Sequence, residues 1–182
     1  MPNHRVAALM VKLFRRNYRR LRRAFLYRNP IAGKIVELMG NKGKISEMTF
    51  DLDNPYIATF LKSRFLFKTY EDGAEQLISD YVDPELPVVE FGGCIGVISC
   101  LTNRQLRNKQ EHVVIEAQPH LIKTLAENRD QNHCEFKVIN AALAYGADEV
   151  EVWINPSLCE PVCAEFTDAQ PPRPRVTHPR PR

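Results

Sequence analysis

The feature that most constrains this chain is a short apolar strand that runs directly into a glycine-rich loop and then a helix. Residues 87–91 form the kind of apolar run expected of a strand buried on both faces. The loop Gly92-Gly93-Cys94-Ile95-Gly96 follows, and residues 97–106 continue as a helix. Glycines let a backbone turn sharply and approach a ligand closely. This order is typical of ligand sites at the carboxyl edge of a parallel sheet.

The same alternation continues after the loop. Further strands are predicted at 112–115, 135–139 and 149–154, and a helix with proline in its first turn at 119–128. Strand, helix, strand, helix, strand at this spacing predicts parallel βαβ units with right-handed crossovers, and therefore an α/β fold. Upstream, the patterns indicate a strand or extended segment at 44–52 and helices at 54–68 and 71–82.

Two carboxylates accompany the glycine loop. Glu90 stands two residues before the first glycine, and Glu116 ends the next strand, twenty residues after Gly96. The glycines at 92, 93 and 96 do not fit the G-x-G-x-x-G pattern of a dinucleotide site, which disfavours a nucleotide-binding oxidoreductase. S-adenosylmethionine carries an amino group and a ribose diol that carboxylates can bind, so the pair favours that cofactor. The alternative is that both acids cap neighbouring elements.

Several motifs in this region together resemble the FkbM-type methyltransferases. The resemblance covers residues 70–154, and its motifs are specific in their order and spacing rather than singly. They are Thr69-Tyr70-Glu71, the loop VVEFGGCIG, Val114-Ile115-Glu116-Ala117-Gln118-Pro119, Leu125 with Glu127-Asn128, and Asn140-Ala141-Ala142-Leu143. The resemblance implies a Rossmann-like class I fold and O-methyl transfer from S-adenosyl-L-methionine to a small-molecule or saccharide hydroxyl.

The resemblance also implies which residues hold the cofactor. Glu90, Gly92 and Gly96 would line the methionine part, Glu116 would hold the ribose, and Asn140-Ala141 would lie against the adenine. The predicted cofactor-binding set is Glu90, Gly92, Gly93, Cys94, Gly96, Glu116, Ala117, Asn140 and Ala141.

The sequence identifies no catalytic residue. Methyl transfer to an alcohol is a direct displacement that needs alignment of the acceptor and, in some enzymes, a base. His112, His120 and His133 are the mid-chain candidates for that base, and each is more simply placed at the edge of a strand or helix. Cys94 lies near a helix N-terminus, which favours a thiolate, but a small loop residue explains it better.

The resemblance implies a larger sheet than the four strands predicted here. We therefore expect the C-terminal strands to be missing, through truncation or because a partner supplies them. An unfinished sheet edge predicts self-association. A non-catalytic cofactor-binding or scaffold protein remains the alternative function.

Charge divides the chain into three zones. Residues 1–36 hold ten Lys or Arg and no acid, the last fourteen hold four Arg and no acid, and the segment between them carries 22 acidic against 11 basic residues. An acidic core disfavours nucleic acid as a partner. Residues 5–28 predict a basic amphipathic helix, which packs on the domain, docks on an anionic membrane surface or contacts RNA.

Composition completes the expectations. Five cysteines without paired spacing favour a reducing, cytoplasmic location over a disulfide framework, and Cys159 with Cys163 lack the second pair that a zinc site needs. The proline- and arginine-rich end is expected to have no regular structure. The predicted organisation is a helical extension, a connecting cap segment, a partial methyltransferase domain and a tail, over residues 1–36, 37–69, 70–155 and 156–182.

Overall fold

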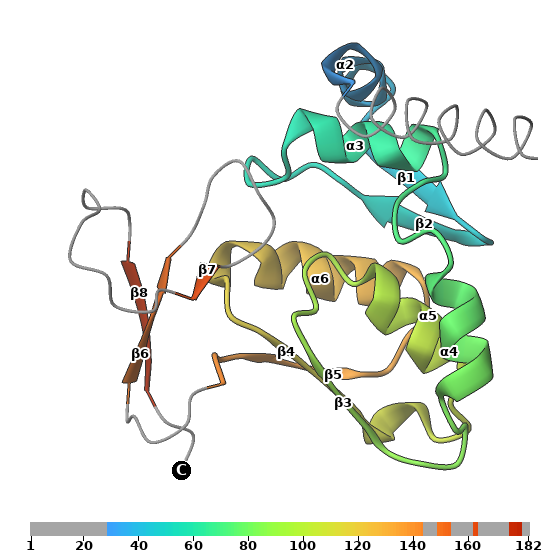
Figure 1. Ribbon diagram of the computed structural model, residues 1–182, viewed down its shortest axis with the longest axis vertical. Coiled ribbons are helices and arrows are strands. Elements are labelled where there is room, and N and C mark those ends of the chain that lie inside the picture. The colour runs from blue at the N-terminus through green and yellow to red at the C-terminus, as the bar shows by residue number, and fades with distance from the viewer. Residues whose placement is uncertain (1–28, 144–148, 154–161, 164–174, 180–182) are drawn as a thin grey trace, which may run out of the picture.

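The computed structural model describes residues 29–143, 149–153, 162–163 and 175–179. The helix predicted over 5–28, and the membrane contact assigned to it, lie outside these residues. Within the described ranges, no helix is long and apolar enough to cross a membrane. The chain folds as a mixed α/β protein whose centre is a small parallel sheet, with a helix and hairpin unit stacked above it (Figure 1).

The helix and hairpin unit, which we call the cap, opens the described chain. It consists of α2 (Pro30–Leu38), β1 (Lys42–Ile45), β2 (Met48–Asp51) and α3 (Thr59–Leu66). The single strand predicted at 44–52 is therefore an antiparallel hairpin, because the chain reverses between Ile45 and Met48. The predicted boundary at residue 36 falls inside α2, which packs on α3 and is capped by Asn29, whose Oδ1 accepts from the Ala32 N–H at 3.1 Å.

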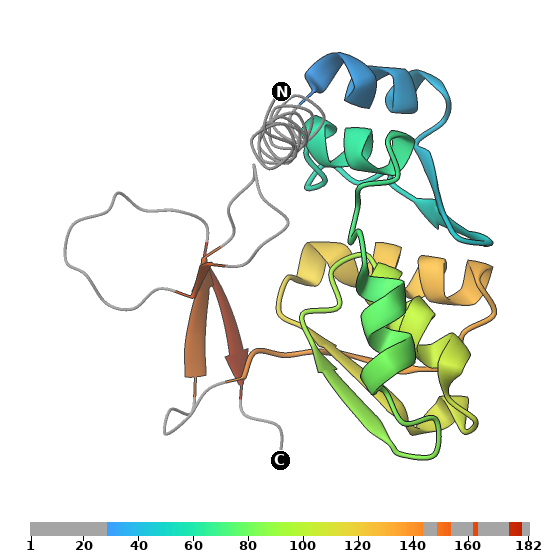
Figure 2. The same ribbon diagram turned by 45° about the vertical axis from the view of Figure 1, so that its right-hand side comes forward.

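The central sheet has three parallel strands in the order β3-β4-β5, as the βαβ pattern predicts. Figures 1 and 2 show α5 and α6 on one side of this sheet, with the cap beyond α6. The elements are α4 (Ala74–Tyr81), β3 (Val88–Phe91), α5 (Val97–Gln105), the short 3-10 helix η1 (Lys109–Glu111), β4 (His112–Glu116), α6 (Pro119–Gln131) and β5 (Lys137–Asn140).

The fourth predicted strand does not join this sheet. β6 (Glu149–Trp153) pairs antiparallel with β7 (Val162–Cys163) and β8 (Arg175–Pro179) in a separate three-stranded sheet. The expectation of a fourth parallel strand is thus wrong. β7 and β8 also fall within the tail that was expected to lack regular structure, so that expectation does not hold for these two segments.

The two faces of the parallel sheet differ sharply. On the face that α5 and α6 cover, His112 and Val114 are fully buried, because Leu121 and Leu125 of α6 pack in the same core. On the opposite face, Val89 and Phe91 of β3 are 58% and 55% exposed. No helix of the described residues covers this second face, and β3 has a strand neighbour on one side only.

Two asparagines, Asn128 of α6 and Asn132 at its C-cap, join the cap to the parallel sheet. Asn132 Oδ1 accepts from the Thr49 N–H at 3.0 Å, and its Nδ2 donates to the Thr49 carbonyl at 2.9 Å. One turn earlier, Asn128 Oδ1 accepts from the Asp51 N–H at 2.6 Å, and its Nδ2 donates to the Asp51 carbonyl at 3.2 Å. The outer edge of β2 is therefore hydrogen-bonded by side-chain amides where a third strand would otherwise pair.

Candidate functional site

Three segments predicted to bind the cofactor meet at the carboxyl edge of the parallel sheet. The Cys94 N–H in the glycine loop donates to Glu116 Oε2 at 2.7 Å. From the end of β5, Asn140 Nδ2 donates to the Glu116 carbonyl at 2.8 Å, and the Ala141 N–H donates to the same carbonyl at 3.2 Å. Glu116 is therefore the residue on which the glycine loop and the Asn140-Ala141 segment converge.

The glycines of the loop have separable roles. Gly92 has φ +87°, and a Cβ added there would meet no atom within 4 Å, so its surface is open. A Cβ on Gly93 would collide with Val114 Cγ1 of β4 and lie 3.1 Å from Leu125 Cδ2 of α6, so this glycine allows the loop to pack closely on β4 and α6. Gly96 has φ +89° and immediately precedes α5, and Cys94 has φ +49°. The loop thus combines an open position, Gly92, with two positions where packing requires glycine, Gly93 and Gly96.

Glu116 is deeply placed and already bonded. It is 1% exposed, and its two carboxylate oxygens accept from the backbone N–H groups of Cys94 and Gln118, both at 2.7 Å. These contacts are those of an acid that fixes neighbouring loops, the alternative weighed from the sequence. Each carboxylate oxygen can accept a second hydrogen bond, and because Glu116 is 1% exposed, a ligand diol reaches it only when a covering loop moves.

Glu90 lies away from the open side of the loop. Its Oε1 accepts from Ser99 Oγ of α5 at 2.9 Å, and its Oε2 stands 3.3 Å from Nε2 of the buried His112. Asn103 Nδ2 in turn lies 3.4 Å from His112 Nδ1. The side chain predicted to face the methionine part of the cofactor is therefore turned toward α5. Sequence reasoning missed Ser99, and it considered His112 only as a base, although the parallel register places His112 on the same face of the sheet as Glu90.

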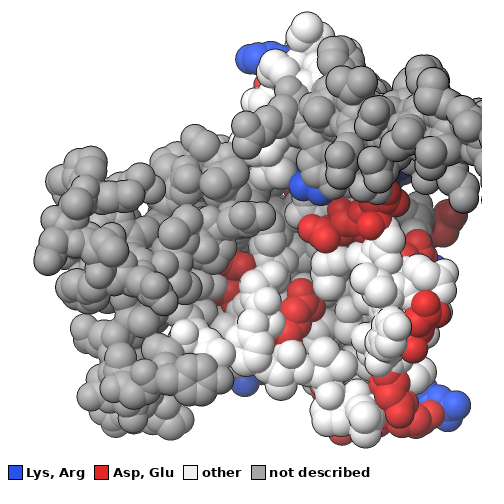
Figure 3. All heavy atoms as spheres, viewed as in Figure 1, with Lys and Arg blue, Asp and Glu red and all other residues white. Residues whose placement is uncertain are grey.

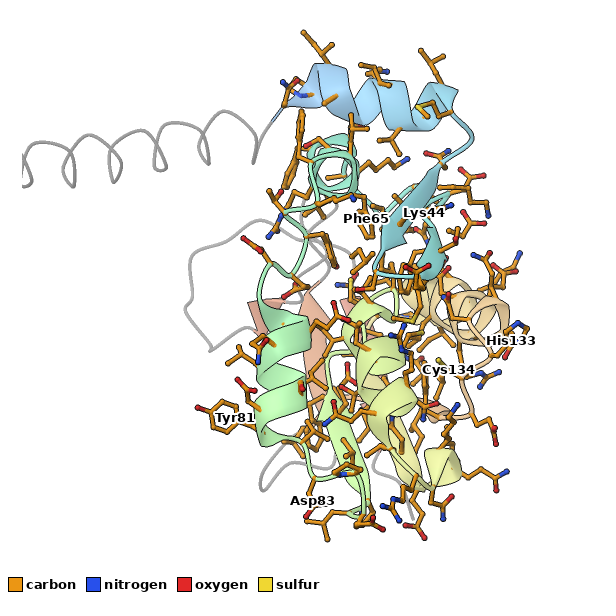
Figure 4. The ribbon with its side chains drawn as sticks, turned by 90° about the vertical axis from the view of Figure 1, so that its right-hand side faces the viewer. Lys44, Phe65, Tyr81, Asp83, His133 and Cys134 are labelled. Atoms are coloured by element: carbon orange, nitrogen blue, oxygen red, sulfur yellow. The ribbon has the colours of Figure 1, made fainter. Side chains whose placement is uncertain are left out.

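The other histidines considered as bases lie elsewhere. His120 stacks on Tyr56 of the cap with ring centroids 4.2 Å apart. His133 follows the end of α6 with φ +55°, and Figure 4 shows it pointing outward there. His112 is fully buried against Glu90. None of the three histidines can therefore be assigned as the base.

Tyr70, from the motif before α4, reaches the glycine loop. Its hydroxyl oxygen lies 4.0 Å from Cys94 Sγ, and its ring stacks on Phe65 at 4.4 Å between centroids. The Arg64 guanidinium lies 5.4 Å from the Tyr70 ring centroid, which places a cation of α3 beside this motif. No sequence pattern points to Arg64, because only the fold of the cap brings its side chain to the Tyr70 ring.

The structure also contains a groove between α4 and α5, apart from the predicted site. None of the nine predicted cofactor residues lines it. Its lining residues are Gly73, Glu75, Gln76, Ile78, Ser79, Leu101, Arg104 and Gln105.

Figure 3 shows that Asp and Glu gather on the described part of the surface in that view. Among the described residues, no group of three or more His, Cys, Asp or Glu side chains is placed to hold a metal ion.

Comparison with known proteins adds no relative to these observations. No protein-family model matches the chain, and no curated protein matches it.

Proposed function

We propose that the chain binds S-adenosyl-L-methionine at the carboxyl edge of the β3-β4-β5 sheet, as an O-methyltransferase of FkbM type. The observation that carries the proposal is the convergence on Glu116 of the glycine loop and the Asn140-Ala141 segment. These segments come from the ends of three neighbouring parallel strands, which is where open α/β sheets bind ligands. The methyl acceptor is a small-molecule or saccharide hydroxyl, and the reaction is a direct displacement at the sulfonium methyl.

Within this proposal the residues take distinct roles. Gly92 offers an open backbone surface to the methionine part, and the free acceptor positions of Glu116 receive the ribose hydroxyls. Asn140 and Ala141 lie against the adenine. Glu90, held by Ser99 and close to His112, acts by supporting the loop rather than by touching the ligand. A cytoplasmic location, and contact with an anionic membrane through residues 5–28, are part of the same proposal.

Calorimetric titration with S-adenosylhomocysteine tests the binding step. We expect micromolar binding by the full chain, no binding of NAD, and a loss of affinity of at least about tenfold in Glu116→Gln, since charge-assisted hydrogen bonds are the stronger kind. Glu127→Gln is the matched control, because Glu127 is exposed and pairs only loosely with Lys123 at 3.7 Å. A folded chain that does not bind S-adenosylhomocysteine would overturn the proposal.

Two further outcomes are informative. If Glu116→Gln does not fold, Ala141→Leu fills the predicted adenine position without changing a carboxylate, and it should also weaken binding. Binding without turnover in a screen of hydroxyl acceptors with labelled cofactor would favour the non-catalytic binding protein. The buried, doubly bonded state of Glu116 is the observation that keeps this second candidate in view.

A further inference from the structure

One buried amide on α6 touches both the cap and the glycine loop. Asn128 is 0% exposed, and it bonds to the Asp51 N–H and carbonyl in β2. The same Nδ2 also donates to the Ile95 carbonyl at 2.9 Å. Its two N–H donors and its oxygen therefore have partners in two segments that are far apart in the sequence.

The Ile95 carbonyl belongs to the part of the loop with the most unusual backbone. Its neighbours Cys94 and Gly96 both have positive φ angles, which an L residue such as Cys adopts only at a cost. Glu116 holds this loop from the side of β4 through the Cys94 N–H. Asn128 holds it from the side of α6, so the loop is fixed from two directions.

Asn132 provides an internal comparison. It bonds to the Thr49 N–H and carbonyl just as Asn128 bonds to those of Asp51, at 3.0 and 2.9 Å. Its second Nδ2 contact, however, is to the Asn128 carbonyl at 2.8 Å and not to Ile95. The two asparagines thus share the contact with the cap, and the contact with the loop distinguishes Asn128.

We propose that Asn128 is a positioning residue for the cofactor loop, and that it couples the conformation of this loop to the β1–β2 hairpin. A buried amide that loses its partners leaves unpaired polar groups, so the bonds to β2 and to Ile95 favour one common arrangement. Cofactor binding that orders the loop would then also order the hairpin, because such coupling is reciprocal. The binding part of this inference rests on the proposed function.

The test compares Asn128→Ala with Asn132→Ala in the full chain. Both variants should lower the urea midpoint, since each removes an amide bridge to β2. Affinity for S-adenosylhomocysteine should fall about tenfold in Asn128→Ala and less than about twofold in Asn132→Ala. Equal losses of affinity in the two variants, or none in Asn128→Ala, would overturn the proposal.

Amide hydrogen exchange measured without ligand separates this inference from the proposed function. The Cys94 and Gly96 amides should exchange faster in Asn128→Ala than in wild type or Asn132→Ala. That result supports the positioning role even if wild type does not bind S-adenosylhomocysteine, and unchanged exchange contradicts it. If Asn128→Ala does not fold, Asn128→Asp keeps an acceptor for the Asp51 N–H but removes the donor to Ile95, and the same exchange pattern is expected.

Discussion

Within the loop, the neighbouring positions 92 and 93 require glycine for different physical reasons. Gly92 needs its positive φ and faces open space, whereas Gly93 needs the absence of a Cβ because Val114 and Leu125 occupy the adjacent volume. A substitution at Gly92 therefore meets backbone strain, and one at Gly93 meets the core. The same residue type thus allows a left-handed backbone at one position and close packing at the next.

Gly93→Ala should destabilise the fold by about 1–3 kcal/mol, because its Cβ would collide with Val114 Cγ1. Urea unfolding measures this loss. The cost should be smaller when Gly93→Ala is introduced into a Val114→Ala background, since the colliding methyl is then gone. Strictly additive costs in the double variant would show that the collision is not the cause.

The thiol of Cys100, inside α5, should resist ionisation. Its hydrogen bond with Cys134 and its burial raise the pKa of the Cys100 thiol above the ordinary value of about 8.5. Figure 4 labels Cys134, whose Sγ lies 3.8 Å from the Cys100 carbonyl. We expect iodoacetamide to label the half-buried Cys94 before Cys100, and raising the pH from about 7 to about 9.5 to leave Cys100 labelling slow in the folded chain.

Peptide mass spectrometry follows the two sites separately. Unfolding in urea should bring the Cys100 rate up to an ordinary, pH-dependent value, which serves as the control for reagent activity. If Cys100 labelling in the folded chain accelerated with pH as much as Cys94 labelling, the raised pKa would be wrong.

At the scale of elements, the β1–β2 hairpin is held by an ion pair as well as by α6. Lys42 and Asp51 are cross-strand partners, and Lys42 Nζ lies 2.7 Å from Asp51 Oδ2. Burial acts to raise the pKa of the Asp51 carboxyl, but hydrogen bonds from Lys42 and from the Asp53 N–H outweigh it and lower the pKa. The ionised carboxylate therefore stabilises the folded hairpin.

Asp51→Asn should change how stability depends on pH. Because the folded pKa of Asp51 is lowered, its contribution is present above the unfolded value of about 4 and is lost as the pH falls below it. The urea midpoint of wild type should exceed that of Asp51→Asn near neutrality, and the gap should close in acid. When both proteins also carry Lys42→Gln, the difference between their urea midpoints near neutrality should be much smaller. A difference between wild type and Asp51→Asn that persisted unchanged in acid would contradict the assignment.

The elements also show what the sequence could predict. The strands β3, β4 and β5 and the helices α5 and α6 follow from buried apolar runs separated by Gly92, Gly96 and Pro119. β6 does not follow the same pattern, because residues 149–152 alternate acidic and apolar side chains, which is typical of a half-exposed antiparallel strand rather than a buried parallel one.

The candidate site was predictable only in part. The ends of β3, β4 and β5 meet as expected, because parallel strands share a carboxyl edge. The side chain of Glu90 turns toward Ser99, and Asn128 reaches Ile95. Both contacts depend on helix rotation and on packing between segments far apart in the chain, which local sequence patterns do not encode.

At the scale of the whole molecule, the parallel sheet is covered on one face and bare on the other among the described residues. Val89 and Phe91 are more than half exposed on β3, which is also an edge strand. Parallel sheets normally have both faces covered, and an open apolar edge invites another strand. The self-association expected from the sequence stays a prediction, and this arrangement assigns it to β3.

Sedimentation velocity should therefore show association that increases with concentration, and Val89→Lys should reduce it. Lysine on an edge strand opposes pairing, and Val89 lies outside the proposed cofactor site, so binding of S-adenosylhomocysteine should be kept. Leu77→Lys, at an exposed residue of α4, is the control and should leave association unchanged. Association unaffected by Val89→Lys but lost on deleting residues 1–28 would assign it to the basic segment instead.

Asn128 and Asn132, in the last turn of α6 and at its C-cap, match a helical repeat to a strand repeat. Four helical residues rise about 6.0 Å, whereas two strand residues advance about 6.8 Å, so the two ladders drift apart by roughly 0.8 Å per step. Asn132 with Thr49 and Asn128 with Asp51 fall within this tolerance. One turn further, Thr124 accepts from the Asn54 side chain instead of bonding to the strand. The amide contacts therefore match two alternate residues of β2, and an inserted residue between Thr49 and Asp51 would break that match, whereas one in the turn before Met48 would not.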